Sequence, residues 1–562
     1  MKKLLSELGD FWRSRIYAVI LSLTAAGAYG FAVTHSAIGM DDTAISLYFD
    51  EGLAPYVGRW TLFVLNKLFR IHIGDYAPYL TELLSVVLLL LSVTLWCVLW
   101  RRVCEPRVKL PMWAYAVTAG LFLSCPLISE VFVFYLHNGV CTGYGVTALA
   151  LLCLLDSLTV QGGRRELVRG TLLSGLLLCV ALGFYESFVI VYAMGAVMVF
   201  LLLRILYGKK GEGAPYRTGF LAWAGRGASA LAAALLGRTV VLAALRLTFS
   251  LDRLSIYNVQ YRSFFGDIFT KENELQMVLK RFFMKYYVNA LTYFPITVLV
   301  AALAVIGVVL VCISIRKKDA MLVAGYLAIL LLPVAMSVLE GLATRYRSAQ
   351  YVPLVSAYAA LLLFLFLYGH KPLPALTGVC GALLAILLVN QCVEMNRWFY
   401  VDELKYEDTR RVMEQIAYDL ETTADISKPV VFRGAYRVPY EIAKEAYVGF
   451  DTWQYRTVCR ITDPIDEHLK EKYYAADAPA YVSAEMPLVS TLQWGVTAFD
   501  GTCGQLIAFW RMHGIGGIQC VTDLAVIEEA EQLRSSENMP AYPQEGYIRD
   551  CGDYLIINMS NE

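Results

Sequence analysis

Charge and histidine are scarce in this sequence. Only 17% of the 562 residues are charged, and Lys plus Arg equal Asp plus Glu at 48 each. A net charge of zero excludes a broad nucleic-acid-binding surface. The 6 histidines are scattered along the chain, which argues against a histidine-ligated metal centre.

Several catalytic motifs are also missing. The chain has no Walker sequence, no HExxH motif and no GxSxG in a strand–turn–helix context, which excludes the common nucleotide, zinc-protease and serine-hydrolase sites. None of its 13 cysteines forms a CxxC pair. The nine between Cys97 and Cys392 lie in or beside apolar segments, where a cysteine is typically a small buried hydrophobe.

Long apolar runs dominate what is present. Hydrophobic residues make up 58% of the chain, which indicates an integral membrane protein. The first run, Ile16 to Val33, follows a basic N-terminus and no small-residue cleavage site comes after it, so we expect a retained helix. Ten further runs give eleven predicted spans: 79–100, 110–128, 141–158, 170–184, 188–207, 227–249, 294–315, 319–338, 349–368 and 374–393.

The connecting segments alternate in charge. Basic residues gather at the N-terminus and at 101–109, 164–169, 209–217 and 316–318, whereas acidic or mixed segments lie between them. The positive-inside rule makes the basic set cytoplasmic. An odd number of spans then places everything after Gln391 outside the cytoplasm. Residues 1–393 are therefore predicted to form an all-α polytopic membrane domain.

The tail, residues 394–562, is polar and has no membrane-length run. We expect an amphipathic helix over Glu403 to Asp425, a strand at Pro429 to Arg433, a helix near Asp523 to Ser535 and two short strands within Tyr547 to Met559. These elements predict a small extracytoplasmic α/β domain. Its location permits a disulfide, with three pairings open among Cys459, Cys503, Cys520 and Cys551.

An acidic segment follows the first predicted span. It holds the adjacent pair Asp41-Asp42 and, further on, Asp50 and Glu51. One aspartate of the pair would act as general base in an inverting sugar transfer, while the other binds a metal or orients the sugar. Alternatively, one of them caps a short helix. Asp50 and Glu51 are typical of a solvated helix end.

A GRW motif comes next in the chain. Arg59 either contacts a phosphate or pairs with an acid just upstream. Trp60 either stacks on a sugar ring or lies at the membrane interface, where tryptophan is common.

Two more outer segments carry candidate residues. Glu186, in the GFYESF segment with Tyr185, is a functional candidate by its position at the mouth of an apolar bundle, or else faces water or bonds to an arginine. Arg345 and Arg347, in EGLATRYR, lie on the face disfavoured for positive charge, so they require an anion: a lipid-linked phosphate or one of the outer acids. The basic and aromatic segment 250–293 suits an interfacial helix.

These motifs together resemble the GtrII-type glucosyltransferase family, bacterial polytopic enzymes similar to the wider GT-C class. The resemblance is clearest from Met40 to Trp60 and in the closing AYPQEGYI and DYLIINM. It implies glucosyl transfer from a polyprenyl phosphate to a surface glycan. GT-C enzymes commonly place an acid of the first outer loop in the catalytic centre, which matches Asp41 or Asp42. The family suggests an amide where this chain has Glu186.

The sequence thus predicts a membrane hexosyltransferase in the bacterial cytoplasmic membrane, with its N-terminus in the cytoplasm. The alternatives are a lipid-linked sugar flippase or transporter, and a glycan polymerase or ligase. The expected partners are a polyprenyl-phosphate sugar donor, a cell-surface glycan acceptor and the bilayer. Asp41 and Asp42 are assigned to catalysis, and to a divalent cation (Mg or Mn) if one is used. The donor phosphate is assigned to Arg345, Arg347 and Arg59. The sugar and acceptor are assigned to Tyr185, Glu186, Trp60 and Glu340.

Overall fold

The computed structural model describes residues 2–35, 58–69, 79–132, 137–248, 297–340, 348–369, 374–436 and 502–560, together with positions 439, 460, 464 and 467. Several predicted features lie outside the described residues and remain predictions. They are Asp41, Asp42, Arg345, Arg347, Cys459 and the proposed interfacial helix at 250–293.

Each of the eleven predicted apolar runs contains a helix among the described residues. Six of these helices are long and apolar enough to cross a membrane: α2, α6, α9, α11, α12 and α20. The protein is therefore mainly helical with several candidate membrane spans, and the count of eleven spans stays a prediction. The helices are α2 (Arg15–Thr34), α6 (Leu80–Cys104), α7 (Met112–Leu123), α9 (His137–Ser157), α10 (Arg164–Leu182), α11 (Phe188–Tyr207), α12 (Phe220–Thr248), α17 (Thr297–Lys317), α18 (Ala320–Glu340), α19 (Val352–Gly369) and α20 (Pro374–Thr423).

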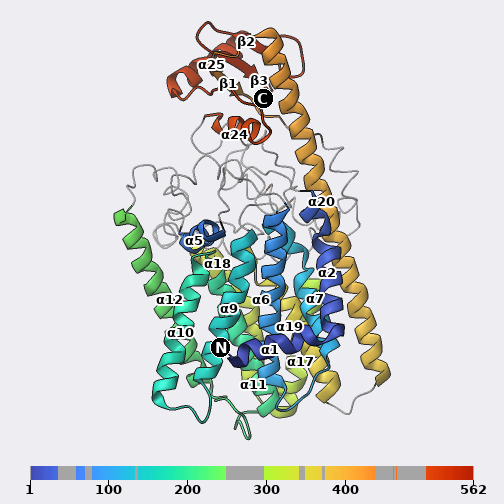
Figure 1. The fold of residues 1–562 in the computed structure, drawn as a ribbon. Coiled ribbons are helices and arrows are strands. Elements are labelled where there is room, and N and C mark those ends of the chain that lie inside the picture. The colour runs from blue at the N-terminus through green and yellow to red at the C-terminus, as the bar shows by residue number, and fades with distance from the viewer. Residues whose placement is uncertain are drawn as a thin grey trace.

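Two short helices mark the two ends of the bundle. Helix α1 (Lys2–Arg13) lies across the bundle near one end, and α5 (Trp60–Phe69) lies at the other (Figure 1). We call these the α1 end and the α5 end. The predicted run 110–128 is shorter as a helix, because α7 stops at Leu123 and Pro126 begins the short helices η1 (Pro126–Ile128) and α8 (Ser129–Phe132).

Buried tyrosines tie the helices together inside the apolar core. The hydroxyl of Tyr29 donates to the carbonyl of Leu123 at 2.7 Å, and that of Tyr358 donates to the carbonyl of Met198 at 3.1 Å. Each bond joins two different elements of the bundle. Because lipid is as apolar as the helix surfaces, such polar links and close packing hold membrane helices together.

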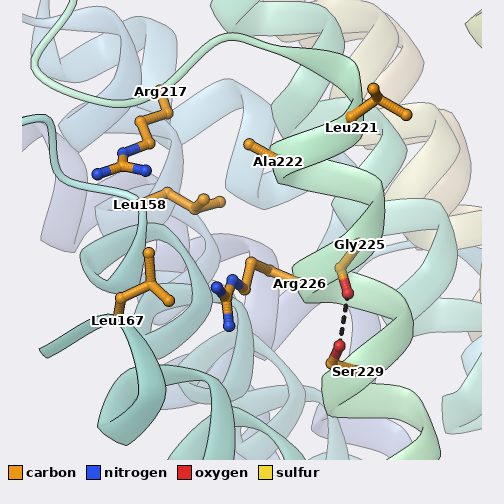
Figure 2. Close-up of a pocket in the computed structure, with 8 residues that line it drawn as sticks. All are labelled: Leu158, Leu167, Arg217, Leu221, Ala222, Gly225, Arg226 and Ser229. Carbon is orange, nitrogen blue, oxygen red and sulfur yellow. Dashed lines mark hydrogen bonds between the residues drawn. The ribbon is translucent and has the colours of Figure 1, made fainter. Parts of the chain in front are cut away.

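The α1 end is held by ion pairs. Arg204 of α11 pairs with Asp319 at 2.7 Å, and Arg102 of α6 pairs with Glu7 at 2.7 Å and with Asp156 at 3.0 Å. These contacts connect α1, α6, α9, α11 and the start of α18. A cavity of about 380 Å³ opens at the same end between α10 and α12 (Figure 2).

Helix α20 runs along the bundle and continues past the α5 end into the tail (Figure 1). It is one 50-residue helix, so the predicted domain boundary at 393/394 falls inside it. The tail places a sheet beside the upper part of α20, with strand order β1-β3-β2, β1 parallel to β3 and β2 antiparallel to it. The tail elements are β1 (Val430–Arg433), α24 (Gly504–Met512), α25 (Leu524–Ser536), β2 (Ile548–Asp550) and β3 (Leu555–Asn558).

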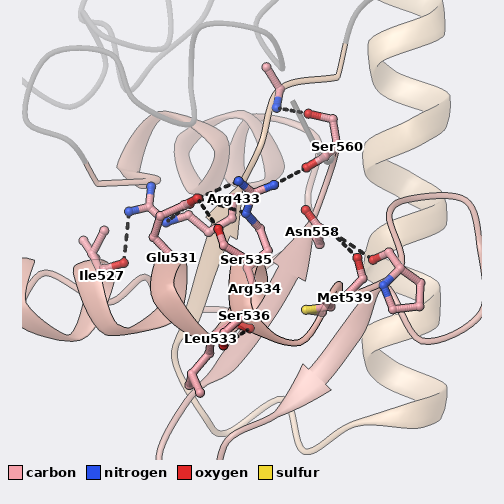
Figure 3. A network of polar contacts seen from close by, with 12 residues as sticks. Arg433, Ile527, Glu531, Leu533, Arg534, Ser535, Ser536, Met539, Asn558 and Ser560 are labelled. Atoms are coloured by element: carbon pink, nitrogen blue, oxygen red, sulfur yellow. Dashed lines mark hydrogen bonds and ion pairs between the residues drawn. The ribbon is translucent and has the colours of Figure 1, made fainter.

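Polar contacts fix the edges of this sheet. Glu531 of α25 accepts from Arg534 at 2.5 Å and lies 3.4 Å from Arg433 of β1, while Arg534 donates to the carbonyl of Ser560 (Figure 3). Asn558 of β3 donates to the carbonyl of Met539 at 2.9 Å. No disulfide joins the tail cysteines among the described residues, namely Cys503, Cys520 and Cys551.

Candidate functional site

The start of α5 is fastened to the end of α10. The backbone N–H groups of Thr61 and Leu62 both donate to the carbonyl of Gly183, at 3.0 and 3.3 Å. A Cβ atom at Gly183 would lie 2.1 Å from the Thr61 hydroxyl and 2.6 Å from the Trp60 ring. Only glycine fits between these groups, so Gly183 sets the close approach of the GRW motif to the hairpin between α10 and α11. Trp60 accordingly packs on this hairpin.

Tyr185 connects two of the predicted motifs. The guanidinium carbon of Arg59 lies 4.7 Å from the centre of the buried Tyr185 ring, within the range of a cation–π interaction. The Tyr185 hydroxyl lies 3.4 Å from the hydroxyl of Ser348. Ser348 directly follows Arg347 in the chain. The hairpin therefore contacts both the GRW motif and the residue next to the Arg-x-Arg pair.

Glu186 forms an ion pair with Arg238 of α12, at 2.9 Å. Both side chains are about a quarter exposed, at 24% and 26%. Gly58 lies against the pair with a φ of +81°, and a Cβ there would be 3.0 Å from the Arg238 guanidinium and 3.3 Å from the Glu186 carboxylate. The sequence alternative of an arginine partner for Glu186 is thus the one observed, and Arg238 is that partner.

A second polar cluster, which the sequence did not indicate, joins the first turns of α6 and α9. Ser85 of α6 lies 2.7 Å from Nδ1 of His137 and also donates to the side-chain carbonyl of Asn138, both at the start of α9. Glu82, one turn before Ser85, is buried as well. We call Glu82, Ser85, His137 and Asn138 the α6–α9 cluster.

The α6–α9 cluster adjoins α5 and the hairpin. A Cβ atom at Gly139, the residue after Asn138, would lie 2.8 Å from Leu62 and 3.2 Å from Phe184. The signal available in the sequence was weak: Glu82 and Ser85 share one face of a predicted span, while His137 precedes the run predicted at 141–158. Only tertiary packing brings them together.

Several buried polar atoms around this cluster lack hydrogen-bond partners within the described part of the chain. They are both side-chain polar atoms of Asn66, the amide nitrogen of Asn138 and the hydroxyl of Ser187. Asn66 lies one turn after Leu62 on α5, and these three side chains are at most 5% exposed. Buried polar groups in native proteins are nearly always bonded, so this arrangement offers donors and acceptors to a hydroxyl-rich ligand.

Not every predicted site residue lies among the described residues. Glu340 is the last residue of α18, and the two aspartates and the Arg-x-Arg pair lie outside the described residues. Within the described ranges, no group of three or more His, Cys, Asp and Glu side chains is placed to hold a metal ion.

These observations define a polytopic helical membrane protein with a polar site at the α5 end of its bundle. The sequence profile of the family described as glucosyl transferase GtrII matches residues 30–364, which is more than half of the chain, and the protein belongs to that family. The resemblance stated from the motifs is confirmed, and membership makes the protein a glucosyltransferase. No curated protein and no solved structure matches the chain.

Proposed function

We propose that the protein transfers a glucosyl group from a polyprenyl phosphate to a cell-surface glycan, at a site on the α5 end. One observation carries the proposal. Gly58, which follows the acidic segment, lies against Glu186 and Arg238, and Ser348, which follows Arg347, lies against Tyr185. Gly58 and Ser348 are described residues that flank the two sets of predicted site residues. Both lie at the Tyr185–Glu186 hairpin.

The reaction is an inverting substitution at the anomeric carbon of glucose. The acceptor hydroxyl oxygen forms a bond to this carbon while the bond from the carbon to the phosphate oxygen breaks, and polyprenyl phosphate leaves. The acceptor proton passes to the carboxylate of Asp41 or Asp42, which acts as general base. Neutralising the leaving phosphate supplies much of the remaining acceleration.

Three arginines would stabilise the negative charge of the leaving phosphate. Arg345 and Arg347 would bind the donor phosphate through charge-assisted bonds, which are stronger than neutral ones. Arg59 lies over Tyr185, and from there it assists the same phosphate.

The sugar and acceptor would be bound by the hairpin and the α6–α9 cluster. The residues assigned to this role are Tyr185, Glu186, Trp60 and Glu340. We add Asn66 and Asn138, because each has buried polar atoms that make no hydrogen bond among the described residues. Glu186 acts while paired with Arg238, so it orients hydroxyl groups and does not take a proton.

The proposed orientation follows the charge of the loops. The α1 end, with its basic segments, faces the cytoplasm of a bacterium, and the α5 end faces outward. The tail then forms an extracytoplasmic α/β unit positioned by α20, where it shapes the acceptor site. If the reaction uses a divalent cation, Mg or Mn, its ligands are Asp41 and Asp42. Loss of transfer in a chelator would reveal that requirement.

The test is a transfer assay in membranes that contain the full chain and polyprenyl-phosphate glucose. We expect Asp41→Asn or Asp42→Asn to lower turnover by roughly 10²-fold or more. Asp50→Asn and Glu51→Gln are the matched controls, because they remove a carboxylate from the same segment and should retain turnover. Wild-type turnover in both Asp41→Asn and Asp42→Asn would overturn the assignment of the base.

A second assay addresses the donor phosphate. Arg345→Ala should raise the KM for the donor, since a guanidinium that binds the phosphate in the ground state is removed. Arg347→Ala should act in the same way. Unchanged donor affinity in both variants would remove the arginines from the phosphate site.

A further inference from the structure

The cavity between α10 and α12 lies at the α1 end, away from the candidate active site. Arg217 and Arg226 line it together with Leu158, Leu167 and Leu221 (Figure 2). In this view Leu158 lies between the two arginine side chains, and the Arg226 side chain extends toward Leu167 of α10. The lining thus combines apolar side chains with two cations and Ser229.

These two cations have no anionic partner within the described residues. The side chains of Arg217 and Arg226 take part in none of the ion pairs or hydrogen bonds of the described chain, although the backbone N–H of Arg217 donates to the carbonyl of Leu158 at 2.7 Å. Arginines at a membrane protein surface bind phosphate well, because their fork of donors matches its oxygens.

Three more arginines near the cavity add to its positive charge. Arg164, Arg165 and Arg169 lie in the first turns of α10 and likewise make no ion pair among the described residues. Glu166, the one carboxylate in that turn, accepts from the backbone N–H of Gly163 at 3.3 Å and so caps its own helix. The nearby carboxylates Glu7 and Asp156 both pair with Arg102, so the arginines of the cavity keep their positive charge available to an anion.

The outward surface next to the cavity is suited to acyl chains. Val168, Leu172 and Leu176 follow one another at four-residue spacing along α10 and are all exposed, as is Leu221 of α12. Only 11% of the apolar window of α12 is buried inside the protein. In a membrane-spanning helix, lipid covers such a surface.

We infer that this cavity binds the phosphate of an anionic membrane phospholipid, with Arg217 and Arg226 as its ligands and the exposed leucines against its acyl chains. A free phosphate ion would contact the arginines but would make no contact with the exposed leucines. The polyprenyl-phosphate donor would have to reach the opposite end of the bundle, because Arg238 lies 12 residues after Arg226 on α12, or about 18 Å along a helix.

The test measures lipid binding to the purified full chain and does not depend on transfer activity. We expect phosphatidylglycerol to raise the melting temperature in detergent, and phosphatidylcholine or inorganic phosphate to leave it unchanged. In Arg217→Gln/Arg226→Gln the increase should disappear, with phosphatidylglycerol binding weakened roughly fivefold for each arginine removed. Native mass spectrometry would count the lipids retained.

Two further variants keep this result interpretable. Arg164→Gln/Arg165→Gln removes the same charge from the same end outside the cavity, and it should weaken phosphatidylglycerol binding clearly less than Arg217→Gln/Arg226→Gln does. Arg217→Lys/Arg226→Lys keeps the charge and should retain part of the binding, which shows that the site folds. A wild-type phosphatidylglycerol response in Arg217→Gln/Arg226→Gln, or equal stabilisation by inorganic phosphate, would overturn the inference.

Discussion

The two ends of the bundle each contain an arginine–carboxylate pair, and the two pairs differ in surroundings. At the α1 end, Arg204 and Asp319 are 8% and 1% exposed, and Asp319 also accepts from the backbone N–H of Met321 at 3.2 Å. At the α5 end, Glu186 and Arg238 are each about a quarter exposed. Nε of the arginine has no hydrogen-bond partner within the described residues in either pair, so exposure is what separates them.

The difference separates a structural contact from a candidate site. A pair buried this deeply holds helices in place, and the loss of one partner leaves a charge in the core. A pair that is about a quarter exposed is screened by solvent and contributes less stability. The Glu186–Arg238 pair also lies against Gly58 and near polar atoms without partners. The greater exposure of this pair is consistent with the substrate site that we propose at the α5 end.

The largest effect on stability is expected at the α1 end. Asp319→Ala should lower the free energy of unfolding by about 3–5 kcal/mol, because it leaves the Arg204 charge buried and unpaired. Thermal melting in detergent measures this. The double variant Arg204→Met/Asp319→Leu should recover most of the loss. If Asp319→Ala melts like the wild type, the pair is not the structural contact that its burial indicates.

At the α5 end, substitution of either residue of the ion pair should lower transfer activity more than stability. Glu186→Gln and Arg238→Gln should each change stability by less than about 1 kcal/mol and lower glucosyl transfer by roughly 10²-fold, as a misplaced binding group does. The charge swap Glu186→Arg/Arg238→Glu restores the ion pair and should restore melting but not transfer. Unchanged transfer in Glu186→Gln would make this pair structural, like the one at the other end.

Asn66 tests whether a buried polar group at the α5 end binds a ligand or stabilises the fold. Asn66→Leu replaces a buried amide that has no hydrogen bond among the described residues, so it should stabilise the protein by about 1 kcal/mol while it raises the KM for a sugar substrate. The control is Asn396→Leu, because the Asn396 amide donates to the carbonyl of Cys392 at 2.9 Å. That variant should destabilise the protein. Destabilisation by Asn66→Leu would argue against an open binding group.

The smallest effect is expected for an exposed pair in the tail. Lys428 donates to Asp550 at 2.6 Å, and this hydrogen bond lowers the pKa of the Asp550 carboxyl below its usual 3.8 and raises that of Lys428. A lowered carboxyl pKa stabilises the fold above pH 3.8, and this stabilisation is lost as pH falls through the lowered value. Melting of wild type and Lys428→Ala should differ slightly at neutral pH and converge once the pH is below the lowered pKa of Asp550. A difference that persists in acid would rule out this pair as its source.

Most of the helices could be predicted from the sequence, because hydrophobic runs and their breaks are local patterns. The predicted strand at Pro429 to Arg433 is present as β1, and the helix predicted near Asp523 to Ser535 is present as α25, whose first turn is capped by Asp523. The boundary at 393/394 was placed by a change of polarity. Helix α20 continues through it, because a helix can pass from lipid to water without a break when its faces change composition.

The sequence by itself determined the membrane class, the family and the candidate segments, since each depends on composition or on residues close together in the chain. Only the tertiary structure decided that Arg238, 52 residues from Glu186, is its partner. It likewise brought Ser85 to His137 across the same separation. Such pairs depend on which helix faces meet, and a chain of similar apolar helices does not encode that choice in any local pattern.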